Sequence, residues 1–199
     1  MSTKLKIAAA VAAAVLLSAC SSPKHEPMPL VNFTPSMEVT EVWSKGLSSA
    51  EGFLVPAVYD DMVFAAGGKT LTRLNARTGE TEWSVSFDSP ITGGVGSDGY
   101  VTAVGLWDGD LEVVDAEGKV SWEKKLTTEL ASPPVVSHGL VIARTMDTRV
   151  SAFEASSGEL QWTYQKSQPA LTVRLPTRML AHDNFLLVGQ PNGHIVILD

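Results

Sequence analysis

A short motif recurs in this chain, and its spacing limits the folds that the chain can adopt. Each copy has an alanine, a glycine two or three residues later, and a tryptophan four residues after that glycine. The glycines are Gly79, Gly118 and Gly158, and the tryptophans are Trp83, Trp122 and Trp162. A further tryptophan, Trp43, precedes Trp83 by 40 residues, and the later spacings are 39 and 40. A period of about 40 residues over most of a chain indicates a repeat architecture.

Within each period, four short apolar runs are separated by turn residues. The first two runs meet at a pair of residues of types that tolerate positive φ angles, as tight hairpins require. These pairs are Asp60-Asp61, Asp98-Gly99, His138-Gly139 and Asp183-Asn184. The run after each pair is the most apolar and predicts a strand buried on both faces. Four antiparallel strands per period, repeated radially, predict an all-β fold: a β-propeller of four-stranded antiparallel blades.

The register of the repeat predicts three complete blades and part of a fourth within residues 38–199. The expected blades cover about residues 53–87, 91–126, 132–165 and 174–199. The fourth blade stops before its own glycine and tryptophan, whereas residues 39–47 form an outer strand with no blade of its own. We therefore expect residues 39–47 to be a closing strand, and the sequence to be about half of a larger propeller. The alternative is that two such halves join as a homodimer.

The recurrence of the motif favours a structural role over a binding site, because every blade must pack on its neighbour. Burying an indole removes about 150 to 250 Å² from water, which is a large contribution for one side chain. We expect this role for Trp43, Trp83, Trp122 and Trp162. The glycines Gly79, Gly118 and Gly158 are interpreted as turn residues, since no helix follows them to receive an anion.

The first residues predict a secretory signal over residues 1–19. Lys4 and Lys6 precede an apolar run, and small residues lie just before Cys20. Such a run is too short to span a bilayer as a permanent helix. Cys20 and its preceding residues resemble the bacterial lipobox, which implies that Cys20 is acylated and becomes the first residue of a lipoprotein. Residues 20–37, which are rich in proline, are then expected to form a flexible tether.

The repeat and the anchor together resemble a known family. The Ala, Gly and Trp motif is similar to the tryptophan-docking repeat of quinoprotein-type propellers with eight blades, over residues 39–199. A lipobox, a tether and such a propeller resemble the BamB family. The resemblance implies a non-enzymatic scaffold that binds the POTRA domains of BamA and assists the assembly and insertion of β-barrel proteins. It also implies unfolded β-barrel clients, and a lipid anchor in the outer membrane, facing the periplasm, since Ser21 is not the aspartate that favours retention in the inner membrane.

The link over residues 165–175 is longer than the other links between blades and carries apolar residues outside the strand pattern. Apolar anchors and arginine dominate the energetics of protein interfaces. By resemblance to a Leu-x-Leu-Arg stretch of the family, Leu171, Val173 and Arg174 are the expected contacts with BamA, with valine in place of the second leucine. The alternative is that this loop covers the edge of an inner strand.

Composition narrows the remaining function classes. Cys20 is the single cysteine, which excludes an internal disulfide and a cysteine-based metal site. The net charge of -7 disfavours nucleic acid as a partner. The histidines lack ligand spacing, and no nucleophile lies in a recognisable motif, so no catalytic, metal or cofactor residue is predicted. Two alternatives stay open: a fragment of a quinoprotein dehydrogenase, whose cofactor and calcium would lie on the propeller axis, and a propeller lipoprotein that binds ligands or acts as a sensor.

Overall fold

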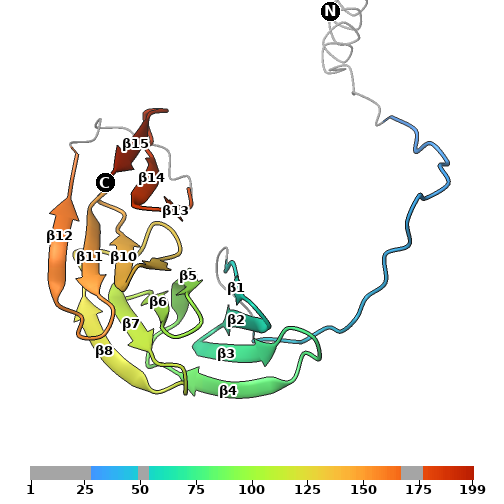
Figure 1. Ribbon diagram of the computed structural model, residues 1–199, viewed down its shortest axis with the longest axis horizontal. Coiled ribbons are helices and arrows are strands. Elements are labelled where there is room, and N and C mark those ends of the chain that lie inside the picture. The colour runs from blue at the N-terminus through green and yellow to red at the C-terminus, as the bar shows by residue number, and fades with distance from the viewer. Residues whose placement is uncertain (1–27, 49–53, 167–176) are drawn as a thin grey trace, which may run out of the picture. The chain divides into compact units, whose positions relative to one another are not determined.

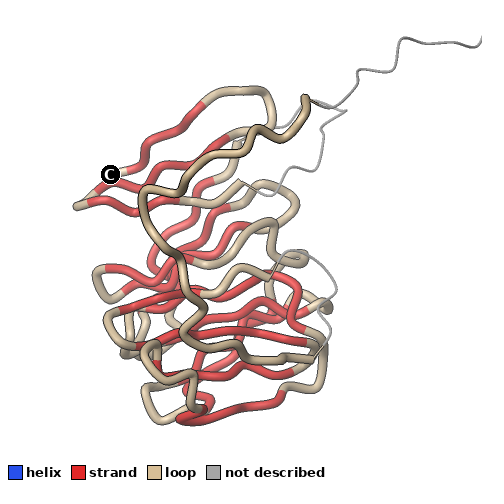
Figure 2. Tube along the Cα trace, turned by 90° about the vertical axis from the view of Figure 1, so that its right-hand side faces the viewer, coloured by secondary structure: helices blue, strands red, loops and turns tan. Residues whose placement is uncertain are grey.

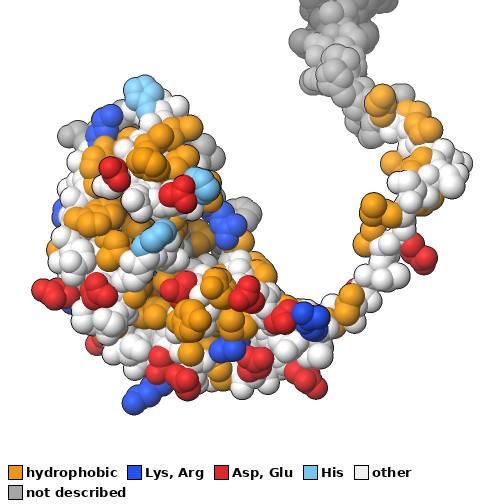
Figure 3. All heavy atoms as spheres, viewed as in Figure 1, with side chains coloured by type: hydrophobic (Ala, Val, Ile, Leu, Met, Phe, Trp, Pro, Cys, Tyr) orange, Lys and Arg blue, Asp and Glu red, His pale blue; other side chains and the backbone are white. Residues whose placement is uncertain are grey.

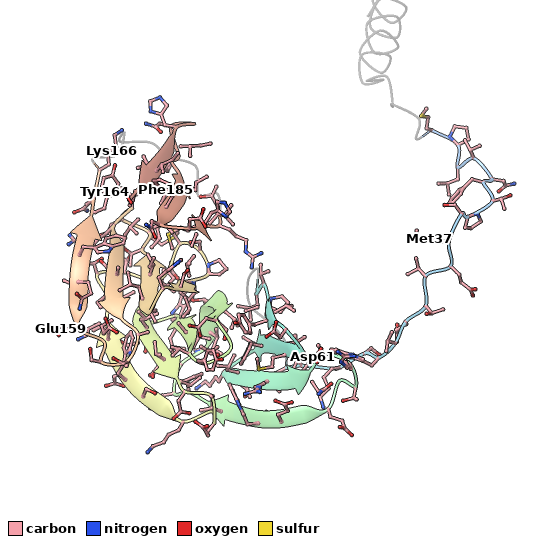
Figure 4. The ribbon with its side chains drawn as sticks, in the orientation of Figure 1. Met37, Asp61, Glu159, Tyr164, Lys166 and Phe185 are labelled. Carbon is pink, nitrogen blue, oxygen red and sulfur yellow. The ribbon has the colours of Figure 1, made fainter. Side chains whose placement is uncertain are left out.

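The computed structural model describes residues 28–48, 54–166 and 177–199. The chain divides into two units, Met1–Thr40 and Glu41–Asp199. In the first unit, residues 28–40 form neither a helix nor a strand and are exposed, as Met37 shows (Figure 4). In the described part of the chain, no helix has the length and apolar character needed to cross a membrane.

The second unit contains four antiparallel sheets that follow one another along an arc (Figure 1). The first sheet has β1 (Ala57–Tyr59), β2 (Met62–Gly67), β3 (Thr70–Asn75) and β4 (Thr81–Ser86). The second has β5 (Ile91–Ser97), β6 (Thr102–Leu106), β7 (Asp110–Val114) and β8 (Val120–Lys125). The third has β9 (Val135–Ser137), β10 (Leu140–Arg144), β11 (Val150–Glu154) and β12 (Leu160–Tyr164). The fourth has three strands, β13 (Leu180–His182), β14 (Phe185–Gly189) and β15 (Ile195–Leu198).

Each sheet is a meander in which strands adjacent in sequence pair with each other. The first strands lie on the inner side of the arc, and β4, β8 and β12 form its outer rim (Figure 1). Seen from the side, the strands of successive sheets are stacked in layers, with their turns at the edges (Figure 2). The predicted hairpin turns have positive φ angles at Asp60, His138 and Asp183, as short turns of this kind require.

The hydrophobic core lies between the sheets in three clusters. Side chains alternate along a strand, so the buried second and third strands contribute to the packing on both neighbouring sheets. Phe64 and Val104 belong to the cluster between the first and second sheets. Val113 and Phe153 belong to the next cluster, and Ala152 and Val188 to the cluster between the third and fourth sheets. Successive sheets are thus held face to face by apolar side chains.

Residues 39–47, which the repeat predicts to be a closing strand, are not assigned to a strand in the structure. A strand needs a neighbouring strand for its hydrogen bonds. Among the described residues, no strand of the repeat lies next to this segment in the predicted order. Its tryptophan, Trp43, is nevertheless held by the first sheet, because its indole Nε1 donates a hydrogen bond to the carbonyl oxygen of Ala76 at 2.8 Å.

Candidate docking surface

Three of the four repeat tryptophans lie against the glycine turn of the following sheet. The indole Nε1 atoms of Trp43, Trp83 and Trp122 donate hydrogen bonds to the carbonyl oxygens of Ala76, Ala116 and Ala155, at 2.8, 2.9 and 2.8 Å. A Cβ atom on Gly79, Gly118 or Gly158 would come within 2.7 Å of the indole Cδ2. These glycines also have φ angles of 73°, 81° and 70°. Glycine is therefore required both for the backbone conformation and for the close approach of the indole.

The fourth tryptophan, Trp162, has no such turn among the described residues. The indole of Trp162 lies instead beside a cavity of about 530 Å³ between the third and fourth sheets. Tyr164 and Phe185, from β12 and β14, also line this cavity and are labelled in Figure 4. In the space-filling view, hydrophobic side chains gather over the fourth sheet (Figure 3).

The residues expected to act directly at a membrane or a partner are not in the described part of the structure. Cys20, the expected acylation site, and Leu171, Val173 and Arg174, the expected partner contacts, lie outside the described residues. The structure does describe both ends of the loop that carries the last three. The chain is described up to Lys166, just after β12 (Figure 4), and again from Thr177.

Hydrogen bonds from the third and fourth sheets hold both ends of this loop. At the first end, the Arg149 Nη2 atom donates to the Gln165 side-chain oxygen at 3.1 Å. The Thr148 hydroxyl shares its proton between the Asp147 carbonyl oxygen at 2.7 Å and the Lys166 carbonyl oxygen at 3.3 Å. At the other end, the Thr177 hydroxyl accepts a hydrogen bond from Arg144 and donates one to the carbonyl oxygen of Gly189 in the fourth sheet. We call residues 144–149, 165–166 and 177 the loop frame.

An ionised aspartate stabilises the turn of the loop frame between β10 and β11. The Thr145 hydroxyl donates to the Asp147 carboxylate, which also lies 3.9 Å from the Arg149 Nε atom. Burial acts to raise the pKa of Asp147. Hydrogen bonds from Thr145, Thr127 and the Arg149 backbone, together with the Arg149 charge, outweigh the effect of burial and lower this pKa. Asp147 therefore stays ionised at neutral pH and accepts the hydrogen bonds that shape the turn.

Arg144 is the buried charge of the loop frame, with 4% of its surface exposed. Its Nη1 atom donates to the Thr177 hydroxyl at 2.8 Å, whereas its Nε atom is buried and has no hydrogen-bond partner. Burial lowers the pKa of the guanidinium group. The motifs in the sequence did not single out Arg144. Its position in the repeat, where the other sheets have small residues, is the signal that could have identified it.

The inner side of the arc carries a groove that bears on the enzyme alternative. Its volume is about 720 Å³, and its lining comes from the first strands and the links before them. The lining includes Val58, Pro133, Pro134 and Leu180, and Arg178 is the one charged residue among its described residues. In the described part of the chain, no three histidine, cysteine or acidic residues lie close enough together to hold a metal ion. A calcium site needs clustered oxygen ligands, so these residues do not fit one.

Comparison with known proteins identifies relatives over most of the chain. The sequence profile of the family described as outer membrane protein assembly factor BamB matches residues 40–90 and 68–199. The protein of that name from Burkholderia pseudomallei is 37% identical over 96% of this chain and 52% of its own length. Its counterpart from Bordetella pertussis is 32% identical over 92% of this chain and 49% of its own length. The chain thus spans about half the length of these relatives.

A solved structure shows the same fold. The crystal structure of BamB from Moraxella catarrhalis superposes with a TM-score of 0.65 at 28% sequence identity, covering 73% of this chain and 45% of that one. The all-β fold predicted from the repeat, with antiparallel sheets as propeller blades, is confirmed by this superposition and by the four sheets observed.

Proposed function

The chain belongs to the family of the outer membrane protein assembly factor BamB, and from this premise we propose that it is a non-enzymatic scaffold of the machinery that assembles outer-membrane β-barrels. In this role it binds the POTRA domains of BamA and assists the insertion of β-barrel proteins. A lipid anchor on Cys20 holds it at the outer membrane, facing the periplasm.

The observation that best supports this proposal is the way both ends of the loop over residues 167–176 are held. Three side chains of the third sheet, Arg144, Thr148 and Arg149, form hydrogen bonds with the residues that flank it. Fixing the two ends of a binding segment removes part of the conformational freedom that the segment would otherwise lose on binding. The loop's apolar residues and Arg174 have the composition of an interface hot spot.

The proposal is tested by measuring the affinity of the BamA POTRA domains for the wild type and for Arg174→Glu. If Arg174 contacts the POTRA domains, reversing its charge is expected to weaken binding by about tenfold to a hundredfold, mainly through faster dissociation. The matched control is Arg77→Glu, which makes the same charge change in an exposed turn between β3 and β4, at the opposite edge of the blade. We expect the control to bind within about twofold of the wild type, because exposed charges remote from an interface contribute little.

Thermal unfolding of both variants separates a local effect from a loss of folding. If Arg174→Glu unfolds at the wild-type temperature and binds the POTRA domains with undiminished affinity, the assignment of this loop as the docking site is wrong. Equal weakening by the control would instead indicate a general effect of net charge, and would also contradict the assignment.

A further inference from the structure

Arg144 occupies a repeat position at which the other three sheets have a small residue. The ladders between second and third strands align the sheets residue by residue. In them, Ala66 pairs with Leu71, Gly105 with Leu111, Gly189 with Ile195, and Arg144 with Val150. The third sheet alone thus places a long cationic side chain where the repeat needs no side chain of that size. The repeat does not require this residue, whose one side-chain hydrogen bond to a described residue is to Thr177.

The charge of Arg144 is not neutralised by any described residue. Among residues 28–48, 54–166 and 177–199, no carboxylate forms an ion pair with it. The adjoining residues 167–176 contain no aspartate or glutamate, so that loop has no carboxylate to offer. A buried cation with no counter-charge is strongly unfavourable, because little in its surroundings replaces the water it has lost. An acceptor that is not part of this region of the chain would remove that cost.

Two further buried polar groups without a partner belong to residues that follow hydrogen-bonded neighbours of Arg144 and Thr177. The Ala131 backbone N–H donates to the Arg144 carbonyl oxygen at 2.8 Å, and the next residue, Ser132, has a buried hydroxyl with no partner. On the other side, the Thr177 hydroxyl donates to the Gly189 carbonyl oxygen at 3.5 Å. The residue after Gly189 is Gln190, whose Nε2 atom is buried without a partner. The third and fourth sheets thus each have one unpaired donor on a residue next to one that is bonded to Arg144 or Thr177.

We propose that Arg144 binds a carboxylate, supplied by an acidic side chain of the protein that docks on the loop frame. The assignment of this carboxylate to the docking protein rests on the proposed function. The guanidinium group is a planar fork whose geometry matches a carboxylate, and the hydrogen bond to Thr177 already fixes its orientation. The unpartnered Nε atom remains for the ligand, and because this atom is buried, the side chains that cover it must move aside when the carboxylate binds. A carboxylate carries one negative charge and therefore balances the single positive charge of Arg144. A phosphate dianion would add an excess negative charge to a chain whose net charge is already -7.

The first test observes the Nε–Hε nuclear magnetic resonance signal of Arg144 in the full chain, assigned by its absence from Arg144→Lys. Titration with sodium acetate is expected to shift this signal in a saturable way, with sodium chloride at equal ionic strength as the control. The signal of Arg149, which already lies beside Asp147, is the internal reference. A signal that moves no more than that of Arg149 would overturn the proposal, as would a response to phosphate and none to acetate.

The second test compares the thermal unfolding of the wild type and of Arg144→Met, which removes the charge but keeps a long apolar side chain. Acetate at 100 times its dissociation constant is expected to raise the ratio of folded to unfolded wild type about a hundredfold. The variant is expected to show no response, and equal responses would contradict the site. If Arg144→Met does not fold, Arg144→Lys takes its place, because it keeps the charge but lacks the planar fork.

The source of the carboxylate is tested separately with the BamA POTRA domains. Arg144→Met is expected to lower their affinity about tenfold, and saturating POTRA domains should move the Arg144 signal in the same direction as acetate does. Unchanged affinity would overturn the assignment of the carboxylate to the partner. If Arg174→Glu leaves POTRA binding intact while acetate still shifts the Arg144 signal, the docking proposal fails and the carboxylate site stands.

Discussion

The interface between the second and third sheets differs from the one between the third and fourth sheets, although the same repeat builds both. Trp122 donates a hydrogen bond to Ala155 in the next sheet, and its ring lies 6.0 Å from that of Phe153. Trp162, at the same repeat position, instead borders a cavity of about 530 Å³. Among the described residues, no glycine turn receives its indole. The tryptophan alone therefore does not close an interface, because it needs the glycine turn of the next sheet.

The two interfaces also differ in polarity. In the second sheet, the position equivalent to Arg144 is Gly105, where an added Cβ atom would overlap the side chain of Leu130. That interface is filled by apolar side chains alone at this point, whereas the other one contains the guanidinium group of Arg144 and the hydroxyl of Thr177. In a repeat protein, a departure from the repeated residue cannot be explained by what all the repeats share. Such departures are therefore where function is best sought.

The largest expected difference comes from removing the two indoles. Trp122→Ala should lower the free energy of unfolding by about 3 to 5 kcal/mol, because it empties a packed site and removes a hydrogen bond. Trp162→Ala should cost only about 1 to 2 kcal/mol, since part of that indole already faces an open cavity. Urea denaturation monitored by circular dichroism measures both values. Equal losses of unfolding free energy would show that the glycine turn adds nothing to the stabilisation that the tryptophan provides.

A smaller difference is expected between two glycines with similar backbone conformations. Gly118 and Gly139 have φ angles of 81° and 72°, but only Gly118 lies against an indole, that of Trp83. Gly139→Ala should cost about 1 to 2 kcal/mol for the left-handed conformation alone. Gly118→Ala should cost about 1 to 3 kcal/mol more, because its Cβ atom overlaps the ring. Chemical denaturation of the two variants checks this, and matching costs would mean that the indole moves aside freely.

The smallest expected effect concerns the turn of the loop frame. Folding lowers the pKa of Asp147, so its contribution to stability is present above the unfolded pKa of about 3.9 and is lost as the pH falls through the folded pKa. Asp147→Asn should therefore cost about 1 kcal/mol at pH 7, with the loss disappearing in acid.

Thermal unfolding across this pH range measures the effect, with Asp61→Asn as the matched control. Asp61 is 61% exposed and pairs with Arg77, so we expect its replacement to change stability by less than about 0.5 kcal/mol. A loss for Asp147→Asn that persisted unchanged at low pH would mean that the ionised carboxylate is not what stabilises the turn.

The sequence by itself determined the period, the positions of the hairpin turns and the residues at each repeated contact. These features depend on local rules, since Asp, Asn and Gly tolerate positive φ angles and a buried strand needs a run of apolar residues. Comparison of equivalent positions also pointed to the link over residues 165–175, whose expected contact residues lie outside the described structure.

What only the tertiary structure decided is what each repeated residue meets in the neighbouring sheet. Trp43 finds the carbonyl oxygen of Ala76 without belonging to a strand, and Trp162 finds a cavity instead of a turn. Arg144 reads in the sequence as the polar end of an apolar run, but the adjoining sheet buries it without a counter-charge. Burial and hydrogen-bond pairing depend on residues that lie far apart in the chain, so a pattern with a period of 40 residues cannot contain them.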